Sequence, residues 1–193
     1  LVGSEMCIRD SALECGAKVQ AIQQGLEKFS GVGRRFQNYG KVFLPHRRGH
    51  ALLFDDYGHH PVELHTTIEA ARLAYPNRRL VLVFQPHRYT RTRDLFEDFI
   101  KELKTADLLI LTEVYAAGEK RIDNADSRAL ARSLRLQNMD SKLIYEADLT
   151  KLAPLVLEQA REGDLILTMG AGNISRVPSE LLALAKEKQR ALS

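Results

Sequence analysis

Two short segments of the sequence, Leu80–Phe84 (LVLVF) and Asp164–Thr168 (DLILT), are apolar almost throughout. A strand without a polar face has to be buried on both sides, which is typical of a parallel sheet covered by helices on both faces. Segments with helical periodicity separate these and other strand-like segments, and such alternation predicts βαβ units. We therefore expect an α/β fold with a doubly wound, mostly parallel sheet.

The other elements follow from the same patterns. Pro61 is suited to the first position of a helix because its ring fixes φ near the helical value. Gly40 is predicted to form the turn between two short strands, and Gly31 and Gly33 are predicted to end the first helix. The predicted strands are Arg35–Tyr39, Lys41–Leu44, Ala51–Phe54, Leu80–Phe84, Asp107–Leu111, Leu143–Tyr145 and Asp164–Thr168. The predicted helices are Ser11–Phe29, Pro61–Tyr75, Thr92–Leu103, Ser127–Leu136, Thr150–Arg161 and Pro178–Leu192.

The composition limits the classes of partner. The chain has 193 residues, of which 45% are hydrophobic and 27% charged, as in ordinary globular domains. No apolar run approaches the roughly 20 residues that a membrane span needs, so no membrane contact is predicted. The net charge of +3 suits small anionic ligands, while the scattered arginines argue against nucleic acid. Cys7 and Cys15 suggest no disulfide framework and no secretory signal precedes them, so we expect a cytoplasmic protein.

Clusters of polar residues follow four of the predicted strands. In open α/β sheets, ligands bind outside the carboxyl ends of the strands. We therefore expect these clusters to meet at one functional edge of the sheet. The four clusters are DDYGHHP (Asp55–Pro61), QPHRYTRTR (Gln85–Arg93), TEVYAAGE (Thr112–Glu119) and MGAGN (Met169–Asn173).

The first cluster allows more than one interpretation. A carboxylate of Asp55 or Asp56 at the end of a strand can accept hydrogen bonds from ribose hydroxyls. Asp56, His59 and His60 also allow a metal site, as in a small metal hydrolase, although adjacent histidines in an extended turn usually point in different directions. A third interpretation is that one histidine caps the following helix while the other is solvated.

The second cluster combines His87 with several arginines where a helix is predicted to begin. Arginine binds carboxylates and phosphates through two parallel hydrogen bonds, and the amino end of a helix adds backbone donors for the same anion. Thr90 or Thr92 is predicted to cap that helix. The alternative is a solvated run of charge. We favour a binding role for Arg88 and Arg91 because the apolar helix face that follows them fixes them on a rigid element.

Two glycine-containing segments are weaker signals. Gly31–Phe36 and Gly170–Asn173 allow close approach of a phosphate or of another backbone segment. Neither contains the complete GxGxxG pattern, and the GxxxxGK[ST] phosphate loop occurs nowhere in the chain. Glu113 and Glu119 receive no predicted role.

Taken in order, GVGRRF, LLFDDYGHHP, FQPHRYTRTRDL, TEVYAAGE, ADS and MGAGNI resemble the C-terminal domain of the Mur ligases. The resemblance covers roughly Ala12 to Leu182 and is strongest to the branch of the family that adds L-alanine. FQPHRYTRTRDL is the most discriminating segment. The resemblance implies a Rossmann-like domain of a three-domain enzyme, in which a UDP-binding domain and a central ATPase precede it.

The resemblance also implies a reaction and a set of site residues. The carboxylate of UDP-N-acetylmuramate would be phosphorylated by ATP, with Mg²⁺ held mainly by the central domain, and the acyl phosphate would then be attacked by the amino group of L-alanine. Arg35 would contact an ATP phosphate, and Asp56 would lie on the nucleotide side. The residues implied for the L-alanine side are Tyr57, His59, His87, Arg88 and Arg91.

The same comparison predicts the domain organisation. Residues 1–10 (LVGSEMCIRD) fit no periodic pattern and are expected to be foreign or disordered. Residues 11–32 are expected to be the terminal helix of a truncated central ATPase domain, and residues 33–193 the C-terminal domain. Without a phosphate loop, the chain alone is expected to be inactive. A non-catalytic nucleotide- or amino-acid-binding module of the same fold remains the alternative.

Overall fold

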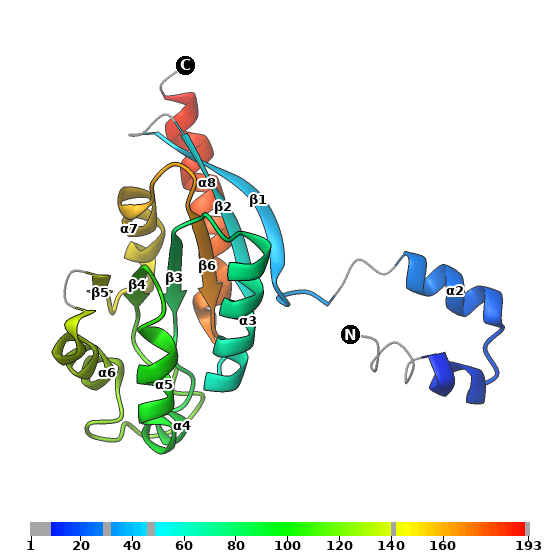
Figure 1. Ribbon diagram of the computed structural model, residues 1–193, viewed down its shortest axis with the longest axis horizontal. Helices are drawn as coiled ribbons and strands as arrows, with labels where there is room; N and C mark the ends of the chain where they lie inside the picture. The colour runs from blue at the N-terminus through cyan, green and yellow to red at the C-terminus, as the bar shows by residue number, and fades with distance from the viewer. Residues whose placement is uncertain (1–8, 29–31, 46–48, 140–141, 192–193) are drawn as a thin grey trace. The chain divides into compact units, whose positions relative to one another are not determined.

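The computed structural model describes residues 9–28, 32–45, 49–139 and 142–191 (Figure 1). The chain divides into two compact units, residues 1–33 and 34–193. Most of the segment predicted to be foreign or disordered, as well as Phe29 and Gly31, lies outside the described residues. Every helix within the described ranges is too short or too polar to cross a bilayer.

The second unit is built on a six-stranded sheet with the strand order β1-β2-β6-β3-β4-β5. β1 pairs with β2 in the antiparallel sense, and all other neighbouring strands are parallel (Figure 1). The predicted mostly parallel α/β fold is confirmed. The strands are β1 (Gln37–Leu44), β2 (Gly49–Asp56), β3 (Leu80–Phe84), β4 (Leu108–Leu111), β5 (Leu143–Tyr145) and β6 (Leu165–Met169).

Helices cover both faces of this sheet (Figure 1). Two apolar clusters form the core, one between the sheet and α3, α5 and α6, the other between the sheet and α7 and α8. The helices of this unit are α3 (Pro61–Ala74), α4 (Tyr89–Asp94), α5 (Phe96–Leu103), α6 (Ser127–Leu134), α7 (Leu152–Gln159) and α8 (Val177–Arg190). Short helical segments precede α7 and α8 at Leu149–Lys151 and Asn173–Arg176, and another, Arg135–Met139, follows α6.

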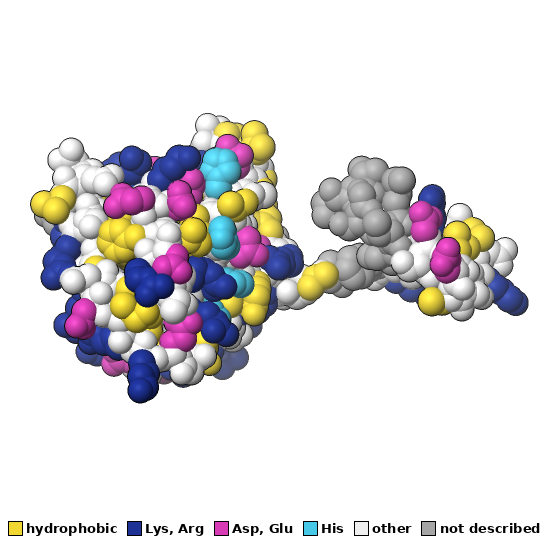
Figure 2. All heavy atoms as spheres, turned by 90° about the horizontal axis from the view of Figure 1, so that it is seen from below, with side chains coloured by type: hydrophobic (Ala, Val, Ile, Leu, Met, Phe, Trp, Pro, Cys, Tyr) yellow, Lys and Arg dark blue, Asp and Glu magenta, His cyan; other side chains and the backbone are white. Residues whose placement is uncertain are grey.

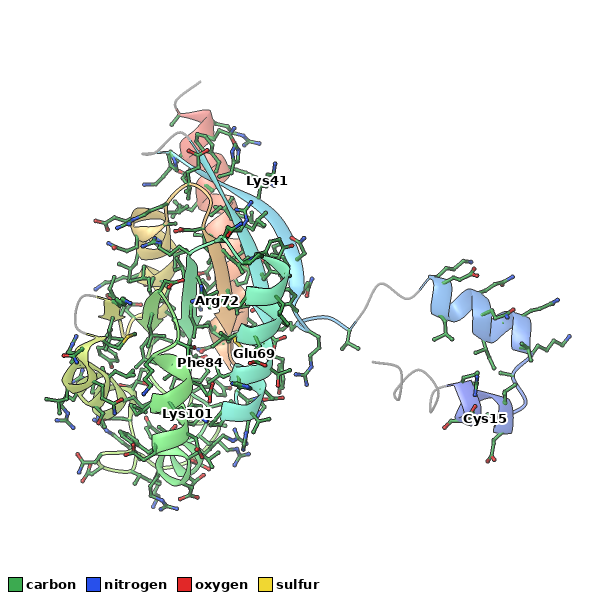
Figure 3. The ribbon with its side chains drawn as sticks, in the orientation of Figure 1. Cys15, Lys41, Glu69, Arg72, Phe84 and Lys101 are labelled. Carbon is green, nitrogen blue, oxygen red and sulfur yellow. The ribbon has the colours of Figure 1, made fainter. Side chains whose placement is uncertain are left out.

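The central strand β3 explains why the core has two halves. Leu82 and Phe84 point into one cluster, while Val81 and Val83 point into the other, and all four are completely buried. Burying each such side chain contributes about 1.5–3 kcal/mol, so both halves depend on this strand. Phe84, labelled in Figure 3, lies against Phe99 of α5 with 5.7 Å between ring centroids.

Several predicted boundaries were wrong, and in three places the element itself differs. The predicted pair of strands around Gly40 is one strand, β1, in which Gly40 adopts φ 87° at a bulge opposite β2. The predicted helix Thr92–Leu103 is interrupted at Leu95, which separates α4 from α5. In the first unit, Gly16 adopts φ 81° and divides the predicted helix into a short helical segment and α2 (Val19–Glu27). No residue of α2 is buried.

Candidate functional site

The polar clusters meet at the carboxyl edge of the sheet, because β6 lies between β2 and β3. Gly170, after β6, donates its backbone N–H to the carbonyl of Asp56, 3.2 Å away. Gln85, after β3, donates from Nε2 to Oδ1 of Asn173 at 2.9 Å, and its Oε1 accepts the N–H of Ile174 at 3.1 Å. Figure 2 looks onto this edge, where histidine side chains gather among basic and acidic ones. The predicted convergence of the clusters at one edge of the sheet is therefore confirmed.

Four rings from three loops form a continuous row along this edge. Tyr57 and His59 follow β2, and their ring centroids are 5.4 Å apart. His59 lies 5.3 Å from His87, which follows β3. His87 stacks on Tyr115 from the loop after β4, with 5.4 Å between centroids. The structure thus brings together three residues predicted for the L-alanine side and adds Tyr115, which lies in a predicted cluster but was given no role.

Arg91 contacts both the backbone and the ring of His87. Its Nη1 donates to the carbonyl of His87 at 3.1 Å and lies 3.3 Å from the Nδ1 atom of the same residue. Because a guanidinium group can only donate, Nδ1 has to be the unprotonated nitrogen of the ring. Burial, followed by the charges of His59, Arg91 and Arg88, lowers the pKa of His87 below its ordinary value of 6.5. His87 is therefore neutral at neutral pH.

The start of α4 is held differently from the prediction. Neither Thr90 nor Thr92 caps the helix; Thr92 instead donates its hydroxyl to the carbonyl of Arg88 at 2.9 Å. Glu119 accepts the backbone N–H of Thr90 at 3.0 Å and its hydroxyl at 2.7 Å. These hydrogen bonds, together with the nearby Arg88, hold the pKa of Glu119 below its usual range, so the carboxylate is ionised.

Asp55 is an anchor inside the site. Its side chain is completely buried, and Oδ2 accepts a hydrogen bond from Nε of Arg34 at 2.7 Å. The hydroxyl of Thr168 on β6 donates to the other carboxylate oxygen at 2.6 Å. Arg34 also donates from Nη2 to the carbonyl of Gly170 at 2.6 Å. Asp55 and Arg34 thus tie the segment before β1 to the ends of β2 and β6.

Asp56, predicted to lie on the nucleotide side, is only 4% exposed. Its Oδ2 accepts the backbone N–H of Phe36, and its Oδ1 accepts that of Gly58, both at 2.7 Å. The backbone N–H of Tyr57 donates to the carbonyl of Arg34 at 2.7 Å. The carboxylate therefore holds two turns in place, one of which carries Arg35.

Arg35 is the more exposed arginine of that turn. Half of its side chain is accessible, and its Nη1 lies 3.3 Å from Oε1 of Glu63. Its guanidinium lies 5.7 Å from the ring centroid of Tyr57, and that of Arg34 lies 5.4 Å from the same ring. A cation in this position can meet an anion without disturbing the buried Asp55–Arg34 contact.

The two histidines of the first cluster have different roles. His60 caps α3: its Nδ1 accepts the N–H of Val62 at 3.3 Å, while Glu63 accepts the backbone N–H groups of His59 and His60. Burial raises the pKa of Glu63, but these N–H groups, the charge of His59 and the hydrogen bond from Arg35 together lower it by more, so the net shift is downward. Within the described part of the chain, no three His, Cys, Asp or Glu side chains form a possible metal site. The metal-hydrolase interpretation therefore has no ligand set among these residues.

Gly172 allows the loop after β6 to pack against the row of rings. A Cβ atom at this position would lie 2.5 Å from Oε1 of Gln85 and 2.6 Å from Cγ of Tyr115. Such distances are shorter than van der Waals contacts allow, so no larger residue fits without movement. The predicted close-approach role of this glycine segment is thus one of packing against protein atoms.

The family model for the Mur ligase glutamate ligase domain matches residues 34–172, which is more than half of the chain. The chain belongs to the Mur ligase family. Over 176 residues it is 60% identical to the UDP-N-acetylmuramate–L-alanine ligase of Neisseria meningitidis serogroup A. That match covers 91% of this chain but 37% of the relative, so the chain spans little more than a third of the relative's length.

Solved structures of the Mur ligase family have the same fold. The UDP-N-acetylmuramate–alanine ligase of Thermotoga maritima superposes with a TM-score of 0.67 at 24% identity, covering 95% of this chain and 37% of that one. A domain of a UDP-N-acetylmuramate:L-alanyl-γ-D-glutamyl-diaminopimelate ligase from Haemophilus ducreyi superposes with a TM-score of 0.55 at 23% identity. It covers 78% of this chain and 99% of that domain.

Sequence reasoning missed the residues that hold the site together. Four side chains make the contacts between the loops, yet none of them was assigned a role: Arg34, Gln85, Tyr115 and Glu119. The contact between Glu119 and Thr90 joins residues 29 positions apart, and that between Arg34 and Gly170 joins residues 136 positions apart. No local pattern carries such information.

Proposed function

We propose that this chain is the C-terminal part of an ATP-dependent ligase that joins L-alanine to UDP-N-acetylmuramate. The observation that carries the proposal is the 60% identity to a ligase of that name over 91% of this chain. The site supports it, because His87, which Arg91 of α4 contacts, lies against His59 at the edge where ligands bind, and Tyr57 lies on the other side of His59.

In the proposed reaction, the carboxylate of UDP-N-acetylmuramate receives the γ-phosphoryl group of ATP. The nitrogen of L-alanine attacks the carbonyl carbon of the acyl phosphate, and the tetrahedral intermediate expels inorganic phosphate as the amide forms. This chain's part is to hold L-alanine and to contribute a cation to the nucleotide. Bringing the two reactants together in this way supplies much of the rate enhancement of such reactions.

On the L-alanine side, Arg88 and Arg91 are suited to the substrate carboxylate because a guanidinium offers several donors in one plane. Tyr57, His59 and His87 form the adjoining wall. A neutral His87 adds no positive charge beside the amino group, which has to lose its own proton before it attacks. This supports an amine rather than a second anion next to His87.

On the nucleotide side, we propose that Arg35 meets a phosphate of ATP. Its exposed guanidinium fits an anionic oxygen. Asp56 acts on the same side through Arg35, because its carboxylate holds the turn that carries this arginine. We propose that Mg²⁺ is held mainly by the part of the enzyme that this chain does not include.

The first unit fits a severed helix of the central ATPase domain. α2 has apolar side chains but buries none of its residues, and Val19 is 59% exposed. We propose that residues 11–32 pack against that domain in the complete enzyme and that the chain alone is inactive.

The complete enzyme is proposed to be cytoplasmic, where ATP is available, and to need neither a membrane nor nucleic acid. The alternative, a non-catalytic nucleotide- or amino-acid-binding module, would lack the upstream domains altogether.

Steady-state kinetics of the complete ligase that carries this sequence test the two sides separately. Arg91→Lys keeps the charge but loses the planar donors, so the KM for L-alanine should rise by about one to two orders of magnitude while the KM for ATP changes little. Arg35→Ala should show the reverse pattern. Equal effects of both variants on both constants would contradict the assignment and indicate a role in domain closure.

A further inference from the structure

The loop after β4, Thr112–Glu119, is hydrogen-bonded to the segment that carries Arg88 and Arg91. The backbone N–H of Tyr115 donates to the carbonyl of Pro86 at 2.8 Å, and the N–H of Arg88 donates to the carbonyl of Tyr115 at 2.9 Å. His87 and Tyr115 stack between these two hydrogen bonds with an interplanar angle of 22°. The β4 loop therefore fixes the backbone on which Arg88 stands.

Glu119, at the end of the same loop, makes side-chain contacts with this segment. The N-cap residue of α4, Arg88, does not cap the helix with its own side chain. Glu119 takes this role instead by accepting both the N–H and the hydroxyl of Thr90. Its Oε1 also lies 3.4 Å from Nη1 of Arg88. One carboxylate, 17% exposed, thus connects the start of the helix with the guanidinium beside it.

Arg88 needs such support because its backbone is in an uncommon conformation. Its φ is 71° and its ψ is 133°, a region that residues other than glycine seldom occupy. A residue is held there only when its surroundings determine its position. The contacts to Tyr115, Thr92 and Glu119 provide that determination.

We propose that Glu119 is a positioning residue for the amino-acid substrate. It acts through Arg88: the contact with Nη1 orients the guanidinium, and the remaining N–H groups stay available for the substrate carboxylate. Glu119 itself need not touch the substrate. This inference rests on the proposed function, because it assumes that Arg88 meets the carboxylate of L-alanine.

Three variants test the role of Glu119. Glu119→Ala removes all three contacts, and Glu119→Gln keeps an acceptor for Thr90 but loses the charge that attracts Arg88. Asp107→Asn is the matched control, because Asp107 also accepts one arginine donor, from Arg72 at 2.7 Å, and one backbone N–H. Asp107 immediately precedes β4, at the end of the parallel strands opposite the candidate site, and Arg72 is labelled on α3 in Figure 3.

The first measurement uses the 193-residue chain and needs no substrate. In ¹⁵N-labelled protein, the backbone amide resonance of Thr90 and the Nε–H resonance of Arg88 should shift in both Glu119 variants and stay in place in Asp107→Asn. Unchanged resonances in Glu119→Ala would overturn the inference, since the contacts on which it depends would then be absent in solution.

The second measurement is the KM for L-alanine in the complete ligase. Glu119→Ala should raise it about tenfold, as expected for one lost charge-assisted contact, with a smaller rise for Glu119→Gln and none for Asp107→Asn. The KM for ATP should stay within about twofold in all three, because Glu119 does not contact the Arg35 side. If the role of Glu119 were merely structural, Glu119→Ala would change the KM for L-alanine, the KM for ATP and the stability together. The structural control Asp107→Asn would then have the same effects as Glu119→Ala.

Arg88→Gln separates this inference from the proposed function. A strong rise in the L-alanine KM with Arg88→Gln, but none with Glu119→Ala, would overturn the positioning role and leave the proposed function intact. No rise with Arg88→Gln would reject the assignment of Arg88 in the proposed function, and the positioning role would fall with it.

Discussion

Asp56→Ala should destabilise residues 34–193 by about 2–6 kcal/mol, because each of the two backbone donors left without an acceptor costs about 1–3 kcal/mol. The donors are the N–H groups of Phe36 and Gly58, both 2.7 Å from the carboxylate of a side chain that is 4% exposed. The free energy of unfolding of domains of this size is about 5–15 kcal/mol, so the lost stability would be a large fraction of the total. Asp56→Asn keeps one acceptor oxygen and should lose about half as much.

Backbone strain makes the turn before β1 especially dependent on this carboxylate. Arg34 and Phe36 both have positive φ values, 58° and 44°, which are unfavourable for side chains of this size. The hydrogen bond from Phe36 to Asp56 and the ion pair between Arg34 and Asp55 offset that strain. Without Asp56, the turn should relax, and Arg35 would lose its fixed position.

Urea unfolding of the 193-residue chain, followed by far-ultraviolet circular dichroism, measures the effect. Asp148→Ala is the matched control: Asp148 also accepts a backbone N–H and a hydroxyl, both from Thr150, but it is exposed. It should therefore lose much less stability than Asp56→Ala. A loss below about 1 kcal/mol for Asp56→Ala would refute the reasoning, since the two donors would then not depend on the carboxylate.

Three further predictions follow from the site. In ¹H–¹⁵N spectra of the imidazole groups, His87 should titrate below 6.5. The unfolded chain therefore binds a proton at His87 more readily than the folded chain does. The contribution of His87 to stability should be complete above pH 6.5 and should be lost as the pH falls from 6.5 to the pKa of His87 in the folded chain. His87→Gln should abolish this loss. Gly172→Ala should cost about 1–3 kcal/mol by thermal unfolding, whereas Gly25→Ala, with open space around its Cβ, should cost nothing. The purified 193-residue chain should release no phosphate from ATP, and turnover abolished by Asp56→Ala would contradict this.

The fold class was predictable from local pattern alone. Apolar strands such as β3, whose bounds match the prediction, need cover on both faces, and Pro61 indicated the start of α3 correctly. The clusters after the strands also indicated where a site would lie, because parallel strands place their carboxyl ends at one edge. These features depend on residue type and spacing, which the sequence shows directly.

The interior of the site was decided by the tertiary structure. Inserting β6 between β2 and β3 places Gly170 beside Asp56 and Arg34, and nothing in the order of residues along the chain requires that insertion. The same insertion brings Asn173 to Gln85. Contacts across the sheet depend on which strands become neighbours, and that is determined by the packing of the whole domain.

The role of a carboxylate was likewise beyond local reasoning. Asp56 and Glu119 are both acidic residues in polar loops, yet their roles differ. Asp56 is buried against backbone donors, whereas Glu119 holds the start of a helix through Thr90, 29 residues earlier in the chain. Sequence alone supplies the charge and the hydrogen-bonding capacity of each side chain. Only the folded backbone decides which donors come close enough to a carboxylate to form a hydrogen bond, because such bonds weaken steeply with distance and misalignment.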